Sequence, residues 1–274
     1  MRDKIEIDSS IELENDRKHT FERCGIGGNM KNKNDRIIIL TLLSIIIILA
    51  VSVVILALRS GEQPDKRTDM QKYYDSKCQS YSVQNVNLAK GQIVFIGDSI
   101  TDLYILDDHY ADLPLACYNR GIGGDTTSGV LSRLKVSLFD LNPSVVVLMI
   151  GTNDINGRLE VDGILERYEQ IIDEINANLP DAQLYCMSII PQNTQIEESG
   201  HIKIAETTPK IISANTRICQ LAEAKGAIYL DLFSLIADED NHLIREYSDD
   251  GLHLNPTGLS VWTKLIKPYL NGEK

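Results

Sequence analysis

Patterns that would hold a metal ion or a nucleotide are missing from this 274-residue sequence. No HExxH pair occurs, and cysteine and histidine do not cluster, so we expect no metal site. The Gly-Lys-Ser/Thr end of a phosphate-binding loop is missing as well. The sequence therefore predicts a protein that works without a metal or a cofactor.

Cysteine is scarce, and its spacing is irregular. The five cysteines include no CxxC pair. Cys24 and Cys78 lie in polar segments, whereas Cys117 and Cys186 lie within apolar, strand-like runs. This distribution favours small hydrophobic side chains in a core over a disulfide framework.

Basic residues are too few to balance the acidic ones, and the formal net charge is −12. Residues 1–36 contain eight basic and eight acidic residues, and the apolar run that follows them has no charge. The whole acidic excess therefore lies in residues 59–274. A negative domain of this kind is not expected to bind nucleic acid or another anionic polymer.

One hydrophobic run is long enough to cross a membrane. Ile37–Leu58 is an uncharged, mostly apolar run of 22 residues between Arg36 and Arg59. At about 1.5 Å per residue, a helix of this length spans a hydrocarbon core of about 30 Å. A cleaved signal peptide would have a shorter apolar region nearer the N-terminus, followed by small residues. The run instead ends in Leu58-Arg59-Ser60, which favours an uncleaved transmembrane anchor.

The charges beside this run do not set its orientation. Each side has four basic residues within about 15 positions: Arg23, Lys31, Lys33 and Arg36 before it, and Arg59, Lys66, Arg67 and Lys72 after it. A single helix near the N-terminus usually serves as an export anchor. We therefore expect a cytoplasmic N-terminus and an extracytoplasmic C-terminal domain.

The apolar run divides the chain into four segments. Residues 1–36 are charged and have no apolar periodicity, which predicts a disordered tail. The transmembrane helix is predicted over 37–58, and the polar residues 59–90 are expected to form a linker with one helix near its end. Residues 91–274 have the pattern of one folded domain.

Short apolar runs alternate with amphipathic stretches in this domain. Strands are predicted at residues 93–96, 115–118, 145–150, 184–189 and 227–230. Helices are predicted at 126–139, 159–178, 209–225 and 256–270, the last with Asn255 as its cap and Pro256 at its first position. This alternation predicts a parallel sheet covered by helices on both faces. Functional residues are then expected at the carboxyl ends of the strands.

A candidate nucleophile follows the first predicted strand. Ser99, within Gly97-Asp98-Ser99-Ile100-Thr101, comes directly after the strand end. A serine hydroxyl is a poor nucleophile at neutral pH, so it needs a neighbouring base, and the base needs a third group that sets its tautomer.

The base has to come from one of five histidines. His19 lies before the predicted membrane helix, and His109 and His201 have no acidic residue and helix cap around them. His242 follows Glu239 by three positions, and His253 follows Asp250 by three, so spacing alone does not separate the two pairs. Residues 238–241 are typical of a solvated acidic turn, whereas His253 lies in a loop directly before the last predicted helix. The context therefore favours Asp250 and His253.

Two loops offer donors for an oxyanion hole. Gly121–Thr126 follows the second predicted strand, and its glycines let backbone N–H groups approach a ligand. Asn153 follows the third strand and adds a side-chain amide, while the Ser99 N–H would complete three donors. The glycine loop also half-matches a dinucleotide-binding fingerprint, but Thr126 stands where the third glycine belongs.

Four blocks, taken in order, resemble the SGNH (GDSL-type) hydrolase family: Gly97-Asp98-Ser99, Gly121–Asp125, Gly151–Asp154 and Asp250-x-x-His253. The resemblance covers residues 90–274, and the two middle blocks are similar to the catalytic subunits of platelet-activating-factor acetylhydrolase and their bacterial relatives. Ile100 stands where the GDSL name has leucine. The GxSxG turn of the α/β-hydrolases is not matched, because Thr101 replaces its last glycine.

The resemblance implies a fold, a site and a reaction. The fold is a flavodoxin-like three-layer sandwich with a five-stranded parallel sheet. Ser99 is implied as nucleophile, His253 as base and Asp250 as its orienting partner, with Ser99, Gly124 and Asn153 as oxyanion donors. The implied reaction is ester hydrolysis through an acyl-serine intermediate.

The expected substrate is a small acyl ester. An acetyl group on an envelope carbohydrate is favoured, because an extracytoplasmic domain meets such polymers. A lysophospholipase or an acyltransferase would use the same triad and remains an alternative. An inactive binding module has the least support, since it would have no reason to keep all five site residues. Membrane contact is expected through residues 37–58.

Overall fold

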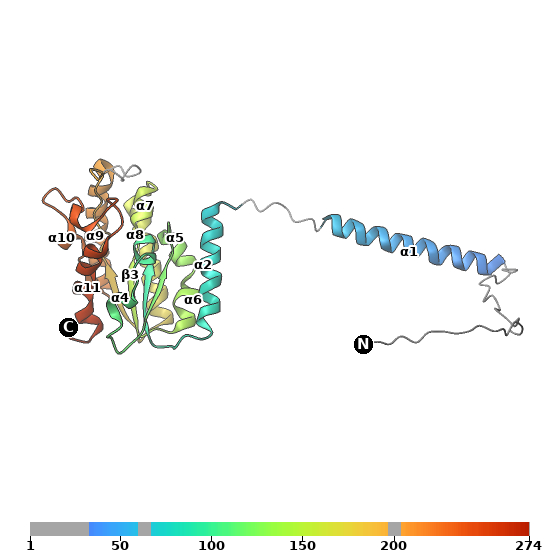
Figure 1. Cartoon of the computed structure of the whole chain (residues 1–274), viewed down its shortest axis with the longest axis horizontal. Helices are drawn as coiled ribbons and strands as arrows, with labels where there is room; N and C mark the ends of the chain where they lie inside the picture. The colour runs from blue at the N-terminus through green and yellow to red at the C-terminus, as the bar shows by residue number, and fades with distance from the viewer. Residues whose placement is uncertain (1–32, 60–66, 197–203, 274) are drawn as a thin grey trace, which may run out of the picture. The chain divides into compact units, whose positions relative to one another are not determined.

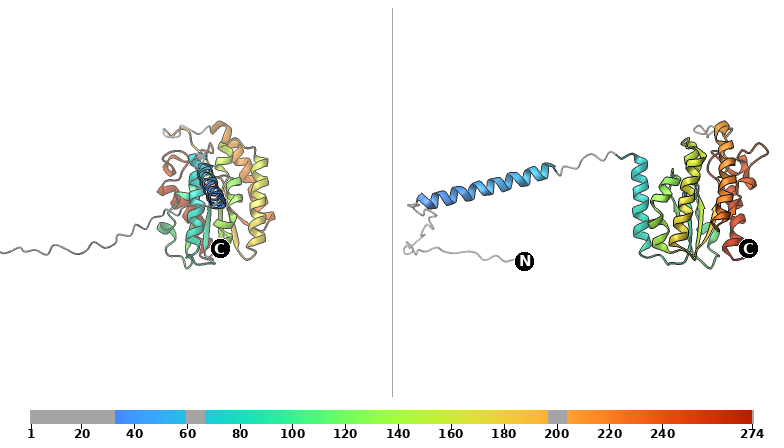
Figure 2. Two further views of the ribbon diagram at one scale, coloured as in Figure 1. Left: turned by 90° about the vertical axis from the view of Figure 1, so that its right-hand side faces the viewer. Right: turned by 180° about the vertical axis from the view of Figure 1, so that it is seen from behind.

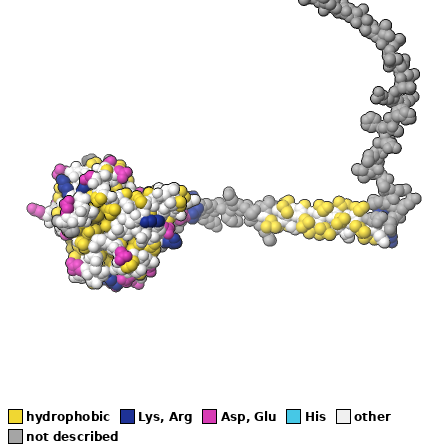
Figure 3. Space-filling view, turned by 90° about the horizontal axis from the view of Figure 1, so that it is seen from below, with side chains coloured by type: hydrophobic (Ala, Val, Ile, Leu, Met, Phe, Trp, Pro, Cys, Tyr) yellow, Lys and Arg dark blue, Asp and Glu magenta, His cyan; other side chains and the backbone are white. Residues whose placement is uncertain are grey.

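The computed structural model describes residues 33–59, 67–196 and 204–273, which belong to two compact units, 1–65 and 66–274. The first unit contains helix α1 (Lys33–Arg59), and the tail predicted for 1–36 lies almost wholly outside the described residues. Residues Arg36–Leu56 of α1 are long and apolar enough to cross a membrane, by length and composition. Figure 3 shows apolar side chains along this helix. The helix predicted at 37–58 is therefore present, and its insertion in a membrane stays a prediction.

The second unit alternates strands and helices (Figure 1). Its strands are β1 (Ile93–Gly97), β2 (Cys117–Gly121), β3 (Val145–Met149), β4 (Gln183–Met187) and β5 (Ile228–Leu230). Its long helices are α2 (Asp69–Asn85), α8 (Val161–Asn178), α9 (Ile204–Ala224) and α11 (Pro256–Leu270). Shorter helical segments are α3 (Ser99–Asp102), α4 (Asp107–Tyr110), α5 (Thr127–Ser132), α6 (Leu134–Ser137), η1 (Phe139–Leu141), α7 (Thr152–Asn156), α10 (Phe233–Ile236) and η2 (Arg245–Tyr247).

The five strands form one parallel sheet in the order β2-β1-β3-β4-β5. This is the flavodoxin-like order, and it confirms the predicted five-stranded parallel sheet. The second strand begins two residues later than predicted, because its polar residues pair inside the fold. Asn119 donates its amide to the backbone oxygen of Thr101 at 2.6 Å, and the Arg120 guanidinium bonds to Asn85 at 2.9 Å.

Helices cover both faces of the sheet (Figures 1 and 2). On one face, α5, α6, α8 and α9 pack against Val94, Ile96 and Val146. On the other, α4, α10 and α11 pack against Phe95, with the indole of Trp262 fully buried. Helix α8 places a stripe at helical spacing in the core, namely Ile164, Leu165, Tyr168, Ile171, Ile172 and Ile175. Full burial of each large apolar side chain contributes about 1.5–3 kcal/mol before entropy is subtracted.

The helix predicted at 126–139 is broken into α5, α6 and η1. The break lies at Arg133, whose backbone (φ −116°, ψ 11°) leaves the helical region. Its guanidinium is drawn into the core to bond with Asp125 and with the backbone oxygen of Gly97. Tertiary hydrogen bonds therefore override the local helical pattern. Helix α9 also begins earlier than predicted, at Ile204 instead of residue 209.

Helix α2 lies in the segment predicted as a linker. Thr68 and Gln71 form a capping box at its start, with side-chain bonds of 3.2 and 2.8 Å to each other's backbone N–H. Near its end, the Tyr81 hydroxyl donates to the Gly121 oxygen, and Asn85 donates to Val136 at 2.7 Å. The compact unit of 66–274 thus includes α2, whereas the predicted domain boundary at residue 91 would leave it out.

Candidate active site

The carboxyl ends of β1, β2 and β3 meet at one edge of the sheet, and the segments after them carry Ser99, Gly124 and Asn153, while Asp250 and His253 lie in the loop before α11. Close backbone packing there requires glycine at two strand ends. A Cβ on Gly97 would lie 2.2 Å from the Met149 oxygen, and one on Gly121 would lie 2.2 Å from the Asp102 nitrogen. A larger residue at Gly121 would therefore push α3, which begins at Ser99, away from β2, and one at Gly97 would push β1 away from β3.

Ser99, His253 and Asp250 form a continuous hydrogen-bonded chain. The Ser99 Oγ lies 2.9 Å from His253 Nε2, although the two residues are 154 positions apart. The His253 Nδ1 lies 2.6 Å from Asp250 Oδ2. The side chains of His253 and Asp250 are 29% and 36% exposed, so solvent reaches the pair. This arrangement can activate a serine hydroxyl, because the carboxylate holds the imidazole proton on Nδ1 and leaves Nε2 free to accept.

Backbone groups surround the Asp250 carboxylate. Its Oδ1 accepts the N–H of Leu252 at 2.8 Å and that of His253 at 2.7 Å. Burial acts to raise the pKa of Asp250, but these bonds and the His253 side chain outweigh burial and lower the pKa below its ordinary value. The carboxylate therefore stays ionised opposite the imidazole.

The loop that carries Asp250 and His253 is held by residues that the sequence analysis did not select. The Ser248 Oγ accepts the Gly251 N–H at 2.8 Å. From the loop after β4, the Asn193 N–H donates to the Gly251 oxygen at 2.8 Å, and its side chain donates to the Leu243 oxygen at 2.7 Å. In the sequence, only the position of Asn193 after a predicted strand end indicated that it could contribute to the site.

The predicted oxyanion donors lie on loops that are tied together. The Asn153 Nδ2 donates to the backbone oxygen of Asp125 at 2.9 Å, and this bond uses one of the two amide hydrogens of Asn153. Gly124 has a φ of +75°, a conformation that favours glycine. Among the described residues, no acceptor is bonded to the backbone N–H of Gly124 or of Ser99. These two N–H groups and the second amide hydrogen are thus available to a ligand.

A buried ion pair braces the glycine loop against the nucleophile strand. The Arg133 Nε lies 2.7 Å from Asp125 Oδ2, and both side chains are almost fully buried. The same guanidinium donates to the Gly97 oxygen at 2.9 Å. The Asp125 carboxylate is therefore occupied by Arg133, and the N-cap of α5 is Thr126, whose hydroxyl accepts the Gly129 N–H at 3.3 Å.

Two further acidic residues have structural partners. The Asp98 Oδ1 accepts the Ile100 N–H at 3.0 Å and caps α3. Asp98 is fully buried, and this burial raises its pKa to about 7. Asp154 accepts both the N–H and the hydroxyl of Thr127, at 2.8 and 2.7 Å. Both residues therefore shape the turns at the edge of the sheet.

The other histidines have different surroundings. The His242 N–H donates to Asp238 Oδ1 at 2.8 Å in a turn after α10, as the acidic-turn interpretation predicts. The His109 Nδ1 lies 2.9 Å from the Thr263 hydroxyl. His19 and His201 lie outside the described residues.

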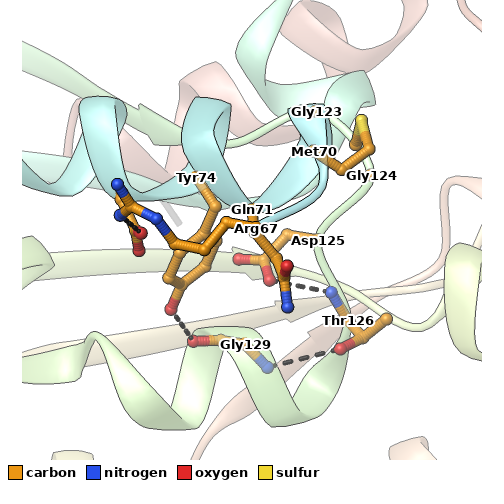
Figure 4. A pocket seen from close by; sticks show the side chains of 10 residues that line it. Arg67, Met70, Gln71, Tyr74, Gly123, Gly124, Asp125, Thr126 and Gly129 are labelled. Atoms are coloured by element: carbon orange, nitrogen blue, oxygen red, sulfur yellow. Dashed lines mark hydrogen bonds and ion pairs between the residues drawn. The ribbon is translucent and has the colours of Figure 1, made fainter. Parts of the chain in front are cut away.

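A cavity of about 360 Å³ lies between α2 and the glycine loop. Figure 4 shows Met70 of α2 beside Gly124, and the Tyr74 hydroxyl bonded to the Gly129 oxygen, at 2.8 Å. Helix α2 therefore lines space next to a predicted oxyanion donor.

The doubly wound sheet holds serine, histidine and aspartate in hydrogen-bond contact beyond its strand ends, an arrangement that can activate a serine hydroxyl. Comparison with known families agrees. Residues 95–260, more than half of the chain, match the GDSL-like lipase/acylhydrolase family, and the chain belongs to this family.

Curated relatives match a part of the chain. Platelet-activating factor acetylhydrolase IB subunit alpha2 of Homo sapiens is 35% identical over 103 residues, which are 36% of this chain and 44% of the relative. The subunit beta homolog of Drosophila melanogaster is 28% identical over 148 residues, which are 51% of this chain and 63% of the relative. The chain thus spans less than two thirds of these relatives.

Solved structures match more of the chain. A Streptococcus pneumonia protein named after platelet activating factor has a TM-score of 0.68 at 29% identity, and the match covers 81% of this chain and 99% of that one. Residues 91–274 make up less than 81% of the chain, so the match also includes residues before 91. A GDSL-like lipase from Bacteroides thetaiotaomicron shares the fold, with a TM-score of 0.62 at 24% identity, covering 72% of this chain and 98% of that one.

Proposed function

We propose that this chain is a membrane-anchored serine esterase that removes short acyl groups, with acetyl esters of envelope carbohydrate as its substrates. One observation carries the catalytic part of the proposal. Ser99 Oγ, His253 and Asp250 are joined by contacts of 2.9 and 2.6 Å beyond the carboxyl ends of a parallel sheet. Family membership supports the reaction class.

The reaction follows from these groups. Ser99 attacks the ester carbonyl while His253 Nε2 accepts the hydroxyl proton. The oxyanion of the tetrahedral intermediate is held by the N–H groups of Ser99 and Gly124 and by Asn153. His253 then gives its proton to the departing alcohol, which leaves an acyl-serine. Water, deprotonated by His253, attacks this ester, and the acid is released as Ser99 regains its proton.

The acetyl preference is supported by the names of the relatives, which are acetylhydrolases. The proposed carbohydrate substrate follows from the proposed location. A catalytic unit outside the membrane and tethered to it meets envelope polymers before it meets other esters.

The anchor is supported by the chemistry of α1. Its apolar side chains are exposed, and its three hydroxyl residues Thr41, Ser44 and Ser52 donate to helix carbonyls three or four positions earlier, at 2.8–2.9 Å. These bonds satisfy the hydroxyls internally, as a hydrocarbon environment requires. Protease added to intact cells is expected to digest the C-terminal unit. Protection of that unit would reverse the proposed orientation and favour an intracellular ester.

The catalytic proposal is tested with the full chain in detergent micelles and the p-nitrophenyl esters of acetate, butyrate and octanoate. We expect the acetate to be hydrolysed fastest and Ser99→Ala and His253→Ala to be inactive. His242→Ala is the matched control and should keep wild-type activity. Activity that survives Ser99→Ala would refute the proposed nucleophile.

The acyl acceptor and chain length are read from the same assay. Fastest hydrolysis of octanoate would favour a lipase-type esterase. Transfer of the acetyl group to an added sugar in preference to water would identify an acyltransferase. No hydrolysis of any ester by the wild-type chain would refute the esterase proposal.

A further inference from the structure

The carboxylate of Asp102 collects hydrogen bonds from separate parts of the chain. Asp102 is the last residue of α3, three positions after Ser99. Its Oδ2 accepts the Tyr73 hydroxyl at 2.5 Å and the backbone N–H of Gly123 at 3.0 Å. Its Oδ1 pairs with the Lys77 Nζ at 2.6 Å. The Asp102 side chain is only 14% exposed, so water competes weakly for these bonds.

The partners of Asp102 belong to elements with different roles. Gly123 directly precedes Gly124, a proposed oxyanion donor. Tyr73 and Lys77 are four positions apart on α2 and therefore lie on the same face of that helix. One carboxylate thus connects three elements. They are α3, which begins with the nucleophile, the glycine loop Gly121–Thr126, from here on called the oxyanion loop, and α2.

The oxyanion loop depends on such outside contacts because of its glycines. Gly123 and Gly124 have wide conformational freedom, and φ at Gly124 is +75°. A turn bond from the Asp125 N–H to the Ile122 oxygen, at 3.1 Å, closes the loop on itself. The bond from Gly123 to Asp102 fixes the peptide group that comes immediately before the Gly124 N–H. Loss of this bond would let the Gly124 donor turn away from the developing oxyanion.

We propose that Asp102 is a positioning residue for the oxyanion loop and that Tyr73 and Lys77 of α2 hold it in place. The proposal rests on the proposed esterase function. It makes α2 a working part of the active site, although this helix lies in the segment that the sequence pattern assigns to a linker.

The expected kinetic effect is on turnover. Oxyanion donors act mainly on the transition state, so a misplaced donor lowers kcat and leaves KM nearly unchanged. Complete loss of one such donor costs about 10²- to 10³-fold, and a displacement of about 1 Å costs up to about 10²-fold. We expect kcat to fall about 10-fold in Lys77→Met and Tyr73→Phe, and about 10²-fold in Asp102→Ala.

A matched control separates positioning from general loss of an ion pair. Lys225 is 26% exposed and pairs with Asp173 at 2.8 Å and with Glu169 at 2.9 Å, while Lys77 is 27% exposed and pairs with Asp102 at 2.6 Å. Lys225 directly follows α9, just before β5 begins, and therefore lies at the edge of the sheet opposite the strand ends that carry the site. Lys225→Met should therefore keep wild-type kcat, although it removes ion pairs of a lysine as exposed as Lys77.

The experiment measures kcat, KM and melting temperature for the full chain in detergent with p-nitrophenyl acetate. Reduced kcat with KM within about twofold, and recovery of kcat in Lys77→Arg, support the proposal. A wild-type kcat in Asp102→Ala, or a kcat loss in Lys225→Met equal to that in Lys77→Met, overturns the positioning proposal. In either case, hydrolysis by the wild-type chain that requires Ser99 still supports the esterase function. Absence of hydrolysis by the wild-type chain overturns both proposals. Tyr73→Phe removes only one hydroxyl, so it tests the network even if Asp102→Ala does not fold.

Discussion

Replacing Asp250 by asparagine tests how the carboxylate directs the histidine. The Oδ1 of Asp250 accepts two backbone N–H groups, from Leu252 and His253, and an asparagine oxygen can keep both bonds. The amide nitrogen would then stand where Oδ2 now lies, 2.6 Å from His253 Nδ1. An amide NH₂ cannot accept the Nδ1 proton, so the imidazole would move that proton to Nε2. Ser99 would lose its base without any change in the shape of the loop.

The size of the effect follows from the lost contact. A hydrogen bond to a charged group contributes about 1.5–3 kcal/mol, or about 10- to 10²-fold, and the wrong tautomer adds to this loss. The same substitution in a serine protease, where the aspartate is buried, lowers kcat about 10⁴-fold. The Asp250 side chain is 36% exposed, so water replaces part of the interaction. We therefore expect Asp250→Asn to lower kcat about 10³-fold.

The assay is steady-state hydrolysis of p-nitrophenyl acetate by the full chain. Asp249→Asn is the matched control, because this neighbouring carboxylate is exposed and, within the part of the chain that the structure describes, its Oδ1 accepts only the Asn255 side chain, at 3.3 Å. The control should keep kcat within about twofold of wild type and have the same melting temperature. Turnover by Asp250→Asn within about threefold of wild type would refute the role assigned to this carboxylate.

Further substitutions test the packing and the buried charge. Gly121→Ala places a Cβ 2.2 Å from the Asp102 nitrogen, so α3 must move by about 1 Å, and we expect kcat to fall up to about 10²-fold. Gly91→Ala meets no atom within 4 Å and should cost about 1–2 kcal/mol of backbone strain in a denaturant titration, with wild-type kcat. Since the pKa of Asp98 is raised from 3.8 to about 7, its contribution to stability is greatest below about pH 4 and declines toward pH 7. Asp98→Asn should therefore gain up to about 4 kcal/mol relative to wild type between pH 4 and pH 8, and parallel pH profiles of the two unfolding free energies would contradict this.

Local signals predicted several elements well. The last helix was predicted at residues 256–270 from Asn255 and Pro256, and α11 has these bounds because cap and first-turn residues act within a few positions. The third strand was predicted from residue 145, where β3 begins, since its β-branched run is buried on both faces. The second strand was placed too early, because its polar residues find their partners in other elements.

The predicted site residues were close in space for a topological reason. Parallel strands bring their carboxyl ends to the same edge, so residues that follow different strands meet there whatever their separation in the chain. By this rule Ser99, Gly124 and Asn153, which follow β1, β2 and β3, lie at the same edge of the sheet. The rule did not select Asn193 or predict that Asp125 pairs with Arg133, because both contacts depend on which polar atom lies within hydrogen-bond reach.

The sequence by itself determined the apolar helix at 37–58, the alternation of strands and helices, and the choice of Ser99, Asp250 and His253, since each of these depends on periodicity or on short motifs. Only the tertiary structure decided that α2 belongs to the hydrolase unit and that the chain breaks its helix at Arg133. Only the tertiary structure also showed that Asp102 joins α2 to the glycine loop. The physical reason is that a hydrogen bond or ion pair depends on distances of about 3 Å between groups that are not neighbours in the sequence, and composition and periodicity do not encode such distances.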